Sequence, residues 1–281
     1  MKVAYVLSGG GAKGSFQVGV MKQLAERGIK PDVIYGTSVG AINAAGFAYA
    51  GIDGLEQQWL GIVGPKWYMP WTPSPDVLGF NWGILFFGWA DAIYNTKPLR
   101  QHLLAQCAGT PICEAIACST NLNDSSIRYV SNMNTSLSDF VDGVESSGTI
   151  PGMMSPVGPW VDGGVRKVLP IEKALADGGF DKIYVINCNP LTELNPDTYD
   201  VTKQFPLFKF LNVAYRSIDG VMEQEIQAGN IDIMRRTSVP LEIYAPSIVP
   251  CSTLDFDPVK IRTNIQMGYT AAPVTLEPEP A

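Results

Sequence analysis

A serine between two glycines, Gly36-Thr37-Ser38-Val39-Gly40, is the part of this sequence best suited to nucleophilic chemistry. It follows a short apolar run, Asp32–Tyr35, and precedes an alanine-rich segment that we expect to form a helix. On a strand–turn–helix of this kind the serine occupies a strained turn with Oγ exposed, and the glycines relieve crowding. The sequence therefore predicts a nucleophile elbow in which Ser38 is the nucleophile and Gly36 and Gly40 make the turn possible.

A serine nucleophile needs a base, and the chain contains one histidine, His102. It falls in a predicted helix ahead of the later acidic motif, whereas an α/β-hydrolase has its residues in the order Ser, acid, His. A carboxylate acting directly on the serine is the remaining option, because burial raises its proton affinity. Asp162-Gly163-Gly164 ends an extended apolar run and suits this role; an ordinary Asp-Gly hairpin turn is the structural alternative.

The glycine-rich stretch Gly9-Gly10-Gly11-Ala12-Lys13-Gly14 has three chemical interpretations. A P-loop is excluded because Lys13 precedes the last glycine instead of following it. The G-x-G-x-x-G spacing fits a dinucleotide site, but the confirming acid should end the second strand and Asp32 begins it. Thirdly, converging backbone N–H groups at a helix N-terminus could form an oxyanion hole. The loop alone does not choose among the last two and a plain strand-to-helix turn.

The elements that would position these residues alternate between strand and helix. Strands are predicted at Val3–Leu7, Asp32–Tyr35, Ile112–Cys118, Ile127–Val130, Lys182–Cys188 and Leu241–Tyr244. Helices are predicted at Ser15–Arg27, Val39–Ala50, Lys97–Gln106, Leu137–Val144, Ile171–Ala176, within Phe205–Arg235, and at Pro258–Met267. This order implies an α/β fold with a mostly parallel sheet and ligands at the carboxyl ends of its strands. We expect one domain over residues 1–281, with a frayed tail after Ala271.

An insertion at about residues 65–95 is unusually aromatic. Between Trp67 and Tyr94 lie nine aromatic residues and two charged ones, Asp76 and Asp91. One interpretation is a core excursion kinked by proline and glycine; the other is a lid or interfacial patch. In the second case residues 67–94 would make peripheral contact with a membrane. That contact would be hydrophobic, since the net charge of −7 disfavours a polybasic anchor.

Composition excludes several classes of protein. Hydrophobic residues make up 46% of the chain and charged residues 17%, which excludes a disordered or coiled-coil protein. The net charge of −7 disfavours a nucleic-acid partner. Five cysteines without a C-x-x-C pair indicate a reducing, cytoplasmic setting. We find no signal peptide or apolar segment of about 20 residues, and we expect no metal or cofactor.

Taken together, these motifs resemble the patatin-like phospholipase family. The resemblance rests on the glycine loop, the elbow around Ser38 and Asp162-Gly163-Gly164, in family order, and spans roughly Met1 to Ile171. Ser146-Ser147-Gly148-Thr149-Ile150-Pro151 is similar to the block that precedes the family's aspartate strand, and Asp255-Phe256-Asp257-Pro258 is similar to bacterial members. The resemblance to this family implies a three-layer α/β/α sandwich and a Ser-Asp dyad that needs neither histidine nor metal.

The resemblance also implies a role for each motif. Ser38 would attack an ester carbonyl while Asp162 accepts its proton, and an acyl-serine would follow. The oxyanion hole would come from Gly9, Gly10, Gly11 and Gly14 of the loop, and the neighbouring Lys13 would contact an anionic headgroup.

We therefore expect a lipid acyl hydrolase acting on phospholipids or lysophospholipids. A neutral glyceride esterase or an acyltransferase with the same dyad is the alternative. A dinucleotide-binding protein and a non-catalytic lipid carrier are further hypotheses from other classes. The sequence says nothing of oligomeric state.

Overall fold

The computed structural model describes residues 1–62, 96–191, 223–248, 251–253 and 255–276 of the 281-residue chain. The aromatic insertion, on which the expected membrane contact through residues 67–94 depends, lies outside these ranges. So does the whole region 205–222, in which part of a helix was expected.

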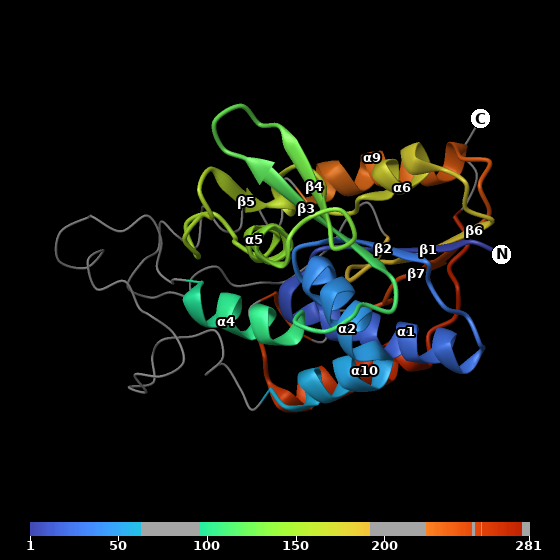
Figure 1. Cartoon of the computed structure of the whole chain (residues 1–281). Coiled ribbons are helices and arrows are strands. Elements are labelled where there is room, and N and C mark those ends of the chain that lie inside the picture. The colour runs from blue at the N-terminus through green and yellow to red at the C-terminus, as the bar shows by residue number, and fades with distance from the viewer. Residues whose placement is uncertain (63–95, 192–222, 249–250, 254, 277–281) are drawn as a thin grey trace, which may run out of the picture.

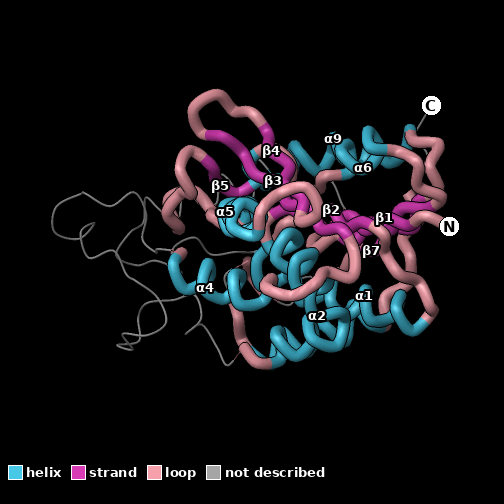
Figure 2. The backbone as a smooth tube through the Cα atoms, in the orientation of Figure 1, coloured by secondary structure: helices cyan, strands magenta, loops and turns pink. Residues whose placement is uncertain are grey.

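A seven-stranded sheet runs through the middle of the molecule (Figure 2). Its order is β4-β3-β2-β1-β6-β7, and β5 also pairs with β3. Five strands are parallel: β1 (Val3–Leu7), β2 (Val33–Thr37), β3 (Glu114–Asn121), β6 (Lys182–Ile186) and β7 (Leu241–Tyr244). Two run antiparallel to β3: β4 (Ile127–Ser131) and β5 (Trp160–Asp162). Strands β1, β2 and β6 are almost wholly buried, which explains their near-continuous apolar sequences.

Helices cover both faces of this sheet (Figure 1). One face carries α1 (Ser15–Glu26), α2 (Val39–Leu60), α4 (Lys97–Gln106), α5 (Leu137–Ser147) and α10 (Pro258–Tyr269). The other carries α6 (Ile171–Asp177) and α9 (Glu223–Arg236). Alternate residues of each strand supply the two cores; in β1, Tyr5 and Leu7 face the first set of helices and Ala4 and Val6 the second. The three-layer α/β/α sandwich is thus confirmed.

Most predicted elements are present, and the main difference lies in α2. The helix predicted to end at Ala50 continues to Leu60, but Gly51 has φ 66° and ψ −176°, so α2 is two helical segments joined by a kink. At the C-terminal end, the Val274 N–H donates to the Ile243 carbonyl (2.7 Å). That bond ties the chain to β7 three residues beyond the point at which we expected fraying to begin.

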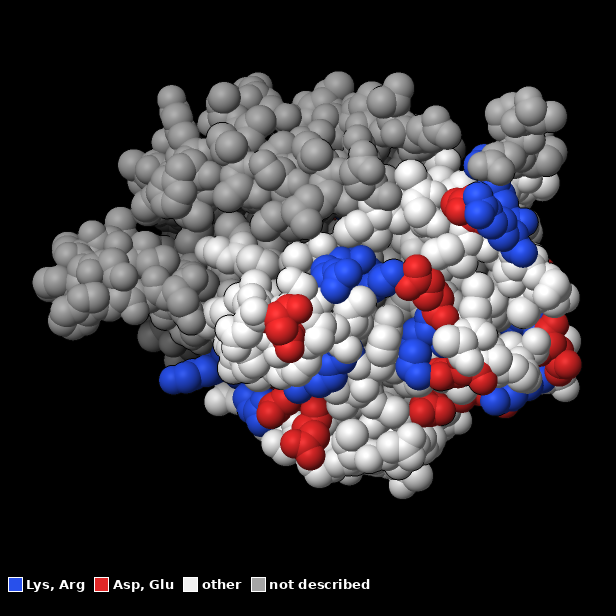
Figure 3. All heavy atoms as spheres, turned by 90° about the horizontal axis from the view of Figure 1, so that it is seen from above, with Lys and Arg blue, Asp and Glu red and all other residues white. Residues whose placement is uncertain are grey.

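Charge is mixed on the described surface. In the view of Figure 3, lysines and arginines alternate with acidic residues among large uncharged areas. Arg100, for example, pairs with both Asp142 and Glu145. No described helix is long and apolar enough to cross a bilayer.

Helices α1 and α10 touch backbone to backbone at two glycines. A Cβ added to Gly19 would lie 1.9 Å from the Ile265 carbonyl oxygen, and one added to Gly268 would lie 2.0 Å from the Phe16 carbonyl oxygen. Any side chain at either position must therefore push the two helices apart.

We expect Gly19→Ala to lower the free energy of unfolding by about 1–3 kcal/mol, the usual cost of overpacking. Gly229→Ala in α9 is the matched control, because a Cβ there meets nothing within 4 Å. A helical alanine should instead stabilise the protein by about 0.5–1 kcal/mol. Urea titration of both variants measures the difference; equal stability of the two would show that α1 and α10 are not in close contact.

Candidate active site

Ser38 occupies a strained turn between β2 and α2. Its φ of 56° and ψ of −127° are unusual for any residue but glycine. The flanking glycines are sterically required: a Cβ on Gly36 would lie 2.2 Å from the Gly40 carbonyl oxygen, and one on Gly40 would lie 2.6 Å from the Leu7 carbonyl oxygen. The tight strand–turn–helix geometry expected of a nucleophile elbow is therefore present, with Ser38 8% exposed; that Ser38 acts as a nucleophile stays a prediction.

The glycine loop lies directly beside this serine. A Cβ added to Gly9 would lie 3.2 Å from Ser38 Cβ and 3.9 Å from its Oγ. The loop then passes through Gly10 and Gly11, both with positive φ, into a 3-10 turn at Gly11–Gly14. At its end a Cβ on Gly14 would lie 2.5 Å from Val39 Cγ2, so this glycine lets the start of α1 pack against the residue after Ser38.

Some backbone N–H groups of the glycine loop donate hydrogen bonds to described parts of the chain, and others do not. Gly9 N–H donates to the Val168 carbonyl (2.9 Å) and Ala12 N–H to the Thr253 carbonyl (2.8 Å). Within the described part of the chain, the N–H groups of Gly10 and Gly11 have no hydrogen-bond acceptor. Of the four glycines expected to form an oxyanion hole, these two have N–H groups available for a ligand, while the Gly9 N–H is already used.

Asp162 reaches the same end of the sheet through strand pairing. Thr37, the last residue of β2, is opposite Cys118 of β3, and Asp162 of β5 is opposite the next β3 residue, Ser119. Since β4 occupies the other edge of β3, β5 must continue along the edge at which β2 stops. A Cβ on Gly163 would lie 2.4 Å from the Cys118 carbonyl oxygen, which explains the glycine after Asp162. Ser38, which follows Thr37, and Asp162 therefore lie next to consecutive residues of β3, Cys118 and Ser119, on the same edge of that strand.

The end of α5 and the residues just after it hydrogen-bond to the backbone of both Ser38 and Asp162. Ser38 N–H donates to Ser147 Oγ (2.8 Å), and Ser147 Oγ–H donates to the Cys118 carbonyl (2.5 Å). The Asp162 N–H donates to the Thr149 carbonyl (3.0 Å). The elbow and the aspartate strand are thus held by one short stretch of chain.

The Asp162 side chain is almost buried, with 5% of the residue exposed. One of its oxygens, Oδ1, accepts a hydrogen bond from Gly164 N–H (2.7 Å). The carboxylate is thereby oriented by its own turn. On the other edge of β3, Arg128 of β4 is opposite Ser119 and donates to its Oγ (3.3 Å). The Arg128 guanidinium also lies over the Trp160 ring, 4.2 Å from the ring centroid.

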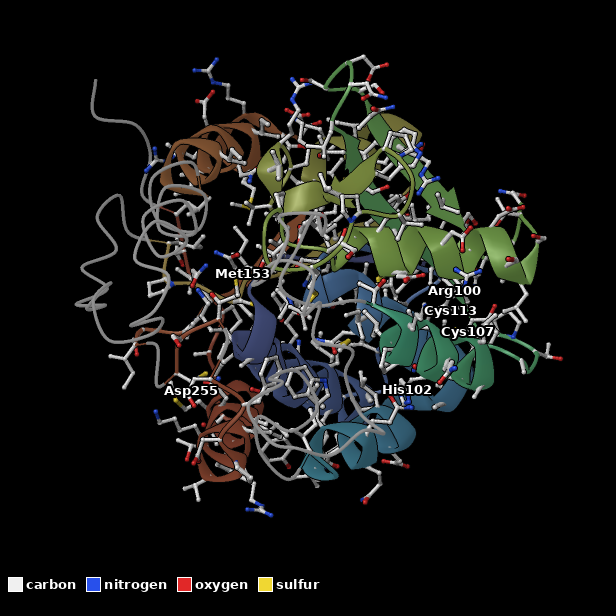
Figure 4. The ribbon with its side chains drawn as sticks, turned by 90° about the vertical axis from the view of Figure 1, so that its left-hand side faces the viewer. Arg100, His102, Cys107, Cys113, Met153 and Asp255 are labelled. Atoms are coloured by element: carbon white, nitrogen blue, oxygen red, sulfur yellow. The ribbon has the colours of Figure 1, made fainter. Side chains whose placement is uncertain are left out.

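His102 lies elsewhere, on α4, which packs against α5 (Figure 4). Burial lowers the pKa of His102. Lys13 is buried within the 3-10 turn, with 3% of the residue exposed, so it is not a solvated surface lysine; its contact with a headgroup stays a prediction. The described residues contain no group of three or more His, Cys, Asp or Glu that could hold a metal ion. All five cysteines lie in the described part of the chain, where they are buried and none forms a disulfide.

Sequence reasoning missed the supporting residues of this site. Ser147 was part of a noted motif, but nothing local marked it as the acceptor for the Ser38 N–H. Thr253 is more than 200 residues from the loop whose Ala12 N–H its carbonyl accepts. Such contacts become visible only once the fold brings the segments together.

Comparison with known proteins places this arrangement in a family context. The model of the patatin-like phospholipase family matches residues 5–175, which include the glycine loop, Ser38 and Asp162. The lysophospholipase NTE1 of Kluyveromyces lactis is 25% identical over 95% of this chain and 18% of its own length. The patatin-like phospholipase domain-containing protein 7 of Rattus norvegicus is 49% identical over 20% of this chain and 4% of its own.

The chain thus spans less than a fifth of the length of these relatives. The crystal structure of VipD from Legionella pneumophila matches with a TM-score of 0.46 and 14% identity, over 95% of this chain and 65% of that one. The family match covers more than half of the chain and all three motifs of the site. This chain belongs to the patatin-like phospholipase family.

Proposed function

We propose that this chain hydrolyses fatty-acyl esters of phospholipids or lysophospholipids through a Ser38–Asp162 dyad. The observation that carries the proposal is the convergence of three groups at one end of the sheet: a strained Ser38, a buried Asp162, and the available N–H groups of Gly10 and Gly11. The family match and relatives named as lysophospholipases support a lipid ester as the substrate class.

In the proposed mechanism, Asp162 accepts the Ser38 hydroxyl proton as Oγ attacks the ester carbonyl. Negative charge then develops on the carbonyl oxygen, and the N–H groups of Gly10 and Gly11 stabilise it. Collapse of the tetrahedral intermediate transfers the proton to the departing alcohol and leaves an acyl-Ser38. Asp162 next takes a proton from water as the water attacks the acyl carbonyl, and collapse of this second tetrahedral intermediate returns the proton to Ser38 Oγ as the fatty acid leaves.

The same dyad would serve a neutral glyceride esterase or an acyltransferase, which differ only in the ester or in the accepting alcohol. A dinucleotide site has less support. Asp32 lies immediately before β2, where its Oδ2 accepts the Val3 N–H (2.7 Å), so this acid is at the amino end of the strand, whereas a dinucleotide site needs an acid at the carboxyl end.

Fatty-acid release tests the proposed function. Wild type is incubated in EDTA with mixed phospholipid and lysophospholipid vesicles, and separately with a triglyceride emulsion. We expect free fatty acid from the phospholipid substrates, undiminished by EDTA and by His102→Gln. Loss of activity in EDTA or with His102→Gln would contradict the dyad. Release from triglyceride alone would change the substrate class to neutral glycerides.

A further inference from the structure

A buried network of amide side chains lies beneath the glycine loop. Gln17 on α1 and Asn43 on α2 are both 0% exposed, although they occupy faces that are otherwise apolar. Asn43 Nδ2 donates to Gln17 Oε1 (2.8 Å) and to the Gly14 carbonyl (3.0 Å). Gln17 Nε2 donates to the Ser8 carbonyl (2.9 Å) and to the Ile186 carbonyl (3.3 Å).

The orientation of both amides follows from a neighbouring indole. Trp59 Nε1–H can only donate, and it donates to Asn43 Oδ1 (2.8 Å). This leaves the Asn43 amino group facing Gly14 and Gln17, and it turns the Gln17 amino group toward Ser8. Burying an amide side chain costs free energy unless its polar atoms are hydrogen-bonded, and it gains little from the hydrophobic effect. The benefit of such a network is therefore that it fixes the positions of the groups it binds.

The network fixes the position of both ends of the glycine loop. Ser8 immediately precedes Gly9, and Gly14 ends the 3-10 turn, so one amide holds the loop where it begins and the other where it ends. Asn43 lies on the helix that Ser38 opens, five residues further along. The loop is thus connected by side-chain hydrogen bonds to the same helix that carries the nucleophile.

The loop needs this support because of its composition. Glycine loses more backbone freedom on ordering than any other residue, and Gly10 and Gly11 both adopt positive φ. Their N–H groups stabilise an oxyanion only if they are aimed before the charge appears. A displacement of these N–H groups by about 1 Å is enough to lower the rate of the catalysed reaction.

We propose that Gln17 and Asn43 are positioning residues for the reaction: through the carbonyls of Ser8 and Gly14 they aim the Gly10 and Gly11 N–H groups at the oxygen of a substrate attacked by Ser38. This inference rests on the proposed function for the roles of Ser38 and the loop, but it does not depend on which ester is cleaved.

Two variants remove the bonds while keeping side-chain size. Asn43→Asp retains the acceptor for Trp59 but loses both donors, and Gln17→Met loses donors and acceptor together. Trp59→Phe is a third variant, which removes the indole donor together with part of the buried ring volume. Leu24→Ala on α1 and Phe47→Leu on α2 are destabilising controls on the same helices, outside the network.

The readouts are kcat and KM for a short p-nitrophenyl ester, the melting temperature, and the Ki of a trifluoromethyl ketone. Such a ketone adds to the serine hydroxyl as a hemiketal, and its former carbonyl oxygen becomes an oxyanion. We expect kcat to fall about 10- to 100-fold in Asn43→Asp and Gln17→Met, less than the loss of an oxyanion donor outright. KM should change little, and Ki should rise in proportion to the fall in kcat/KM. Trp59→Phe should show a smaller loss of the same kind.

The controls, at a comparable fall in melting temperature, should keep wild-type kcat and Ki. If the network variants lose activity only as the controls do, the network is merely structural and the inference is wrong. If the two amide variants do not fold, Trp59→Phe decides: unchanged kcat and Ki overturn the inference. A wild type that cleaves the p-nitrophenyl ester but no lipid refutes the proposed substrate alone, and a wild type inert to both refutes both proposals.

Discussion

Replacing Ser38 with alanine is expected to lower kcat/KM for ester hydrolysis by roughly 10⁴- to 10⁶-fold, the range seen when a catalytic serine is removed. Alanine keeps the turn but has no oxygen to attack the carbonyl. Fatty-acid release from vesicles, measured beside the wild type at equal folded concentration, gives the ratio. Residual activity near the wild-type level would show that Ser38 is not the nucleophile.

A second substitution at this position separates chemistry from stability. The φ and ψ of Ser38 suit glycine, so Ser38→Gly relieves strain of about 1–3 kcal/mol while also removing the nucleophile. We expect an inactive protein that melts at a higher temperature than Ser38→Ala. A Ser38→Gly variant that is less stable than Ser38→Ala would contradict the strained elbow.

Replacing Asp162 with asparagine is expected to lower kcat/KM by roughly 10⁴-fold with little effect on folding. The amide oxygen can still accept the Gly164 N–H, so the turn survives, but an amide cannot take the serine proton. The measurement is the same fatty-acid assay, with circular dichroism to confirm the fold.

Asp124→Asn is the matched control for this change. Asp124 Oδ1 accepts an N–H from the residue two positions on, Ser126 (2.8 Å), just as Asp162 accepts from Gly164, but Asp124 lies exposed in the hairpin between β3 and β4. It should retain full activity. If Asp162→Asn were as active as Asp124→Asn, then Asp162 would be a turn residue only and the base would have to be sought elsewhere.

The α/β architecture was predictable because its signals are local. Buried parallel strands such as Lys182–Ile186 appear as short apolar runs, and α1 repeats its apolar residues at helical spacing before a glycine. The helix predicted to end at Ala50 instead continues past a kink at Gly51, because a glycine in the sequence does not reveal whether the chain turns or goes on as a kinked helix. Packing against the rest of the fold decides that.

The three motifs of the candidate site were also visible locally in the sequence, whereas the residues that support them were not. Each of the three motifs carries glycines whose steric need the structure explains, as at Gly36 and Gly163. The carbonyl of Thr253 and the hydroxyl of Ser147 act on the loop and the elbow from distant parts of the chain. Gln17 and Asn43 left one trace in the sequence, a polar residue on an otherwise apolar helix face, and such a residue has many explanations until its partners are known.

The central claim is that Ser38 becomes acylated during turnover, and trapping that intermediate tests it most directly. Wild type and Ser38→Ala are mixed with a long-chain p-nitrophenyl ester, quenched in acid, digested and mapped by mass spectrometry. We predict a mass increase of one acyl group on the peptide containing Ser38 in the wild type, and its absence in Ser38→Ala. An active wild type that carries the acyl group on another residue, or on none, would contradict the account.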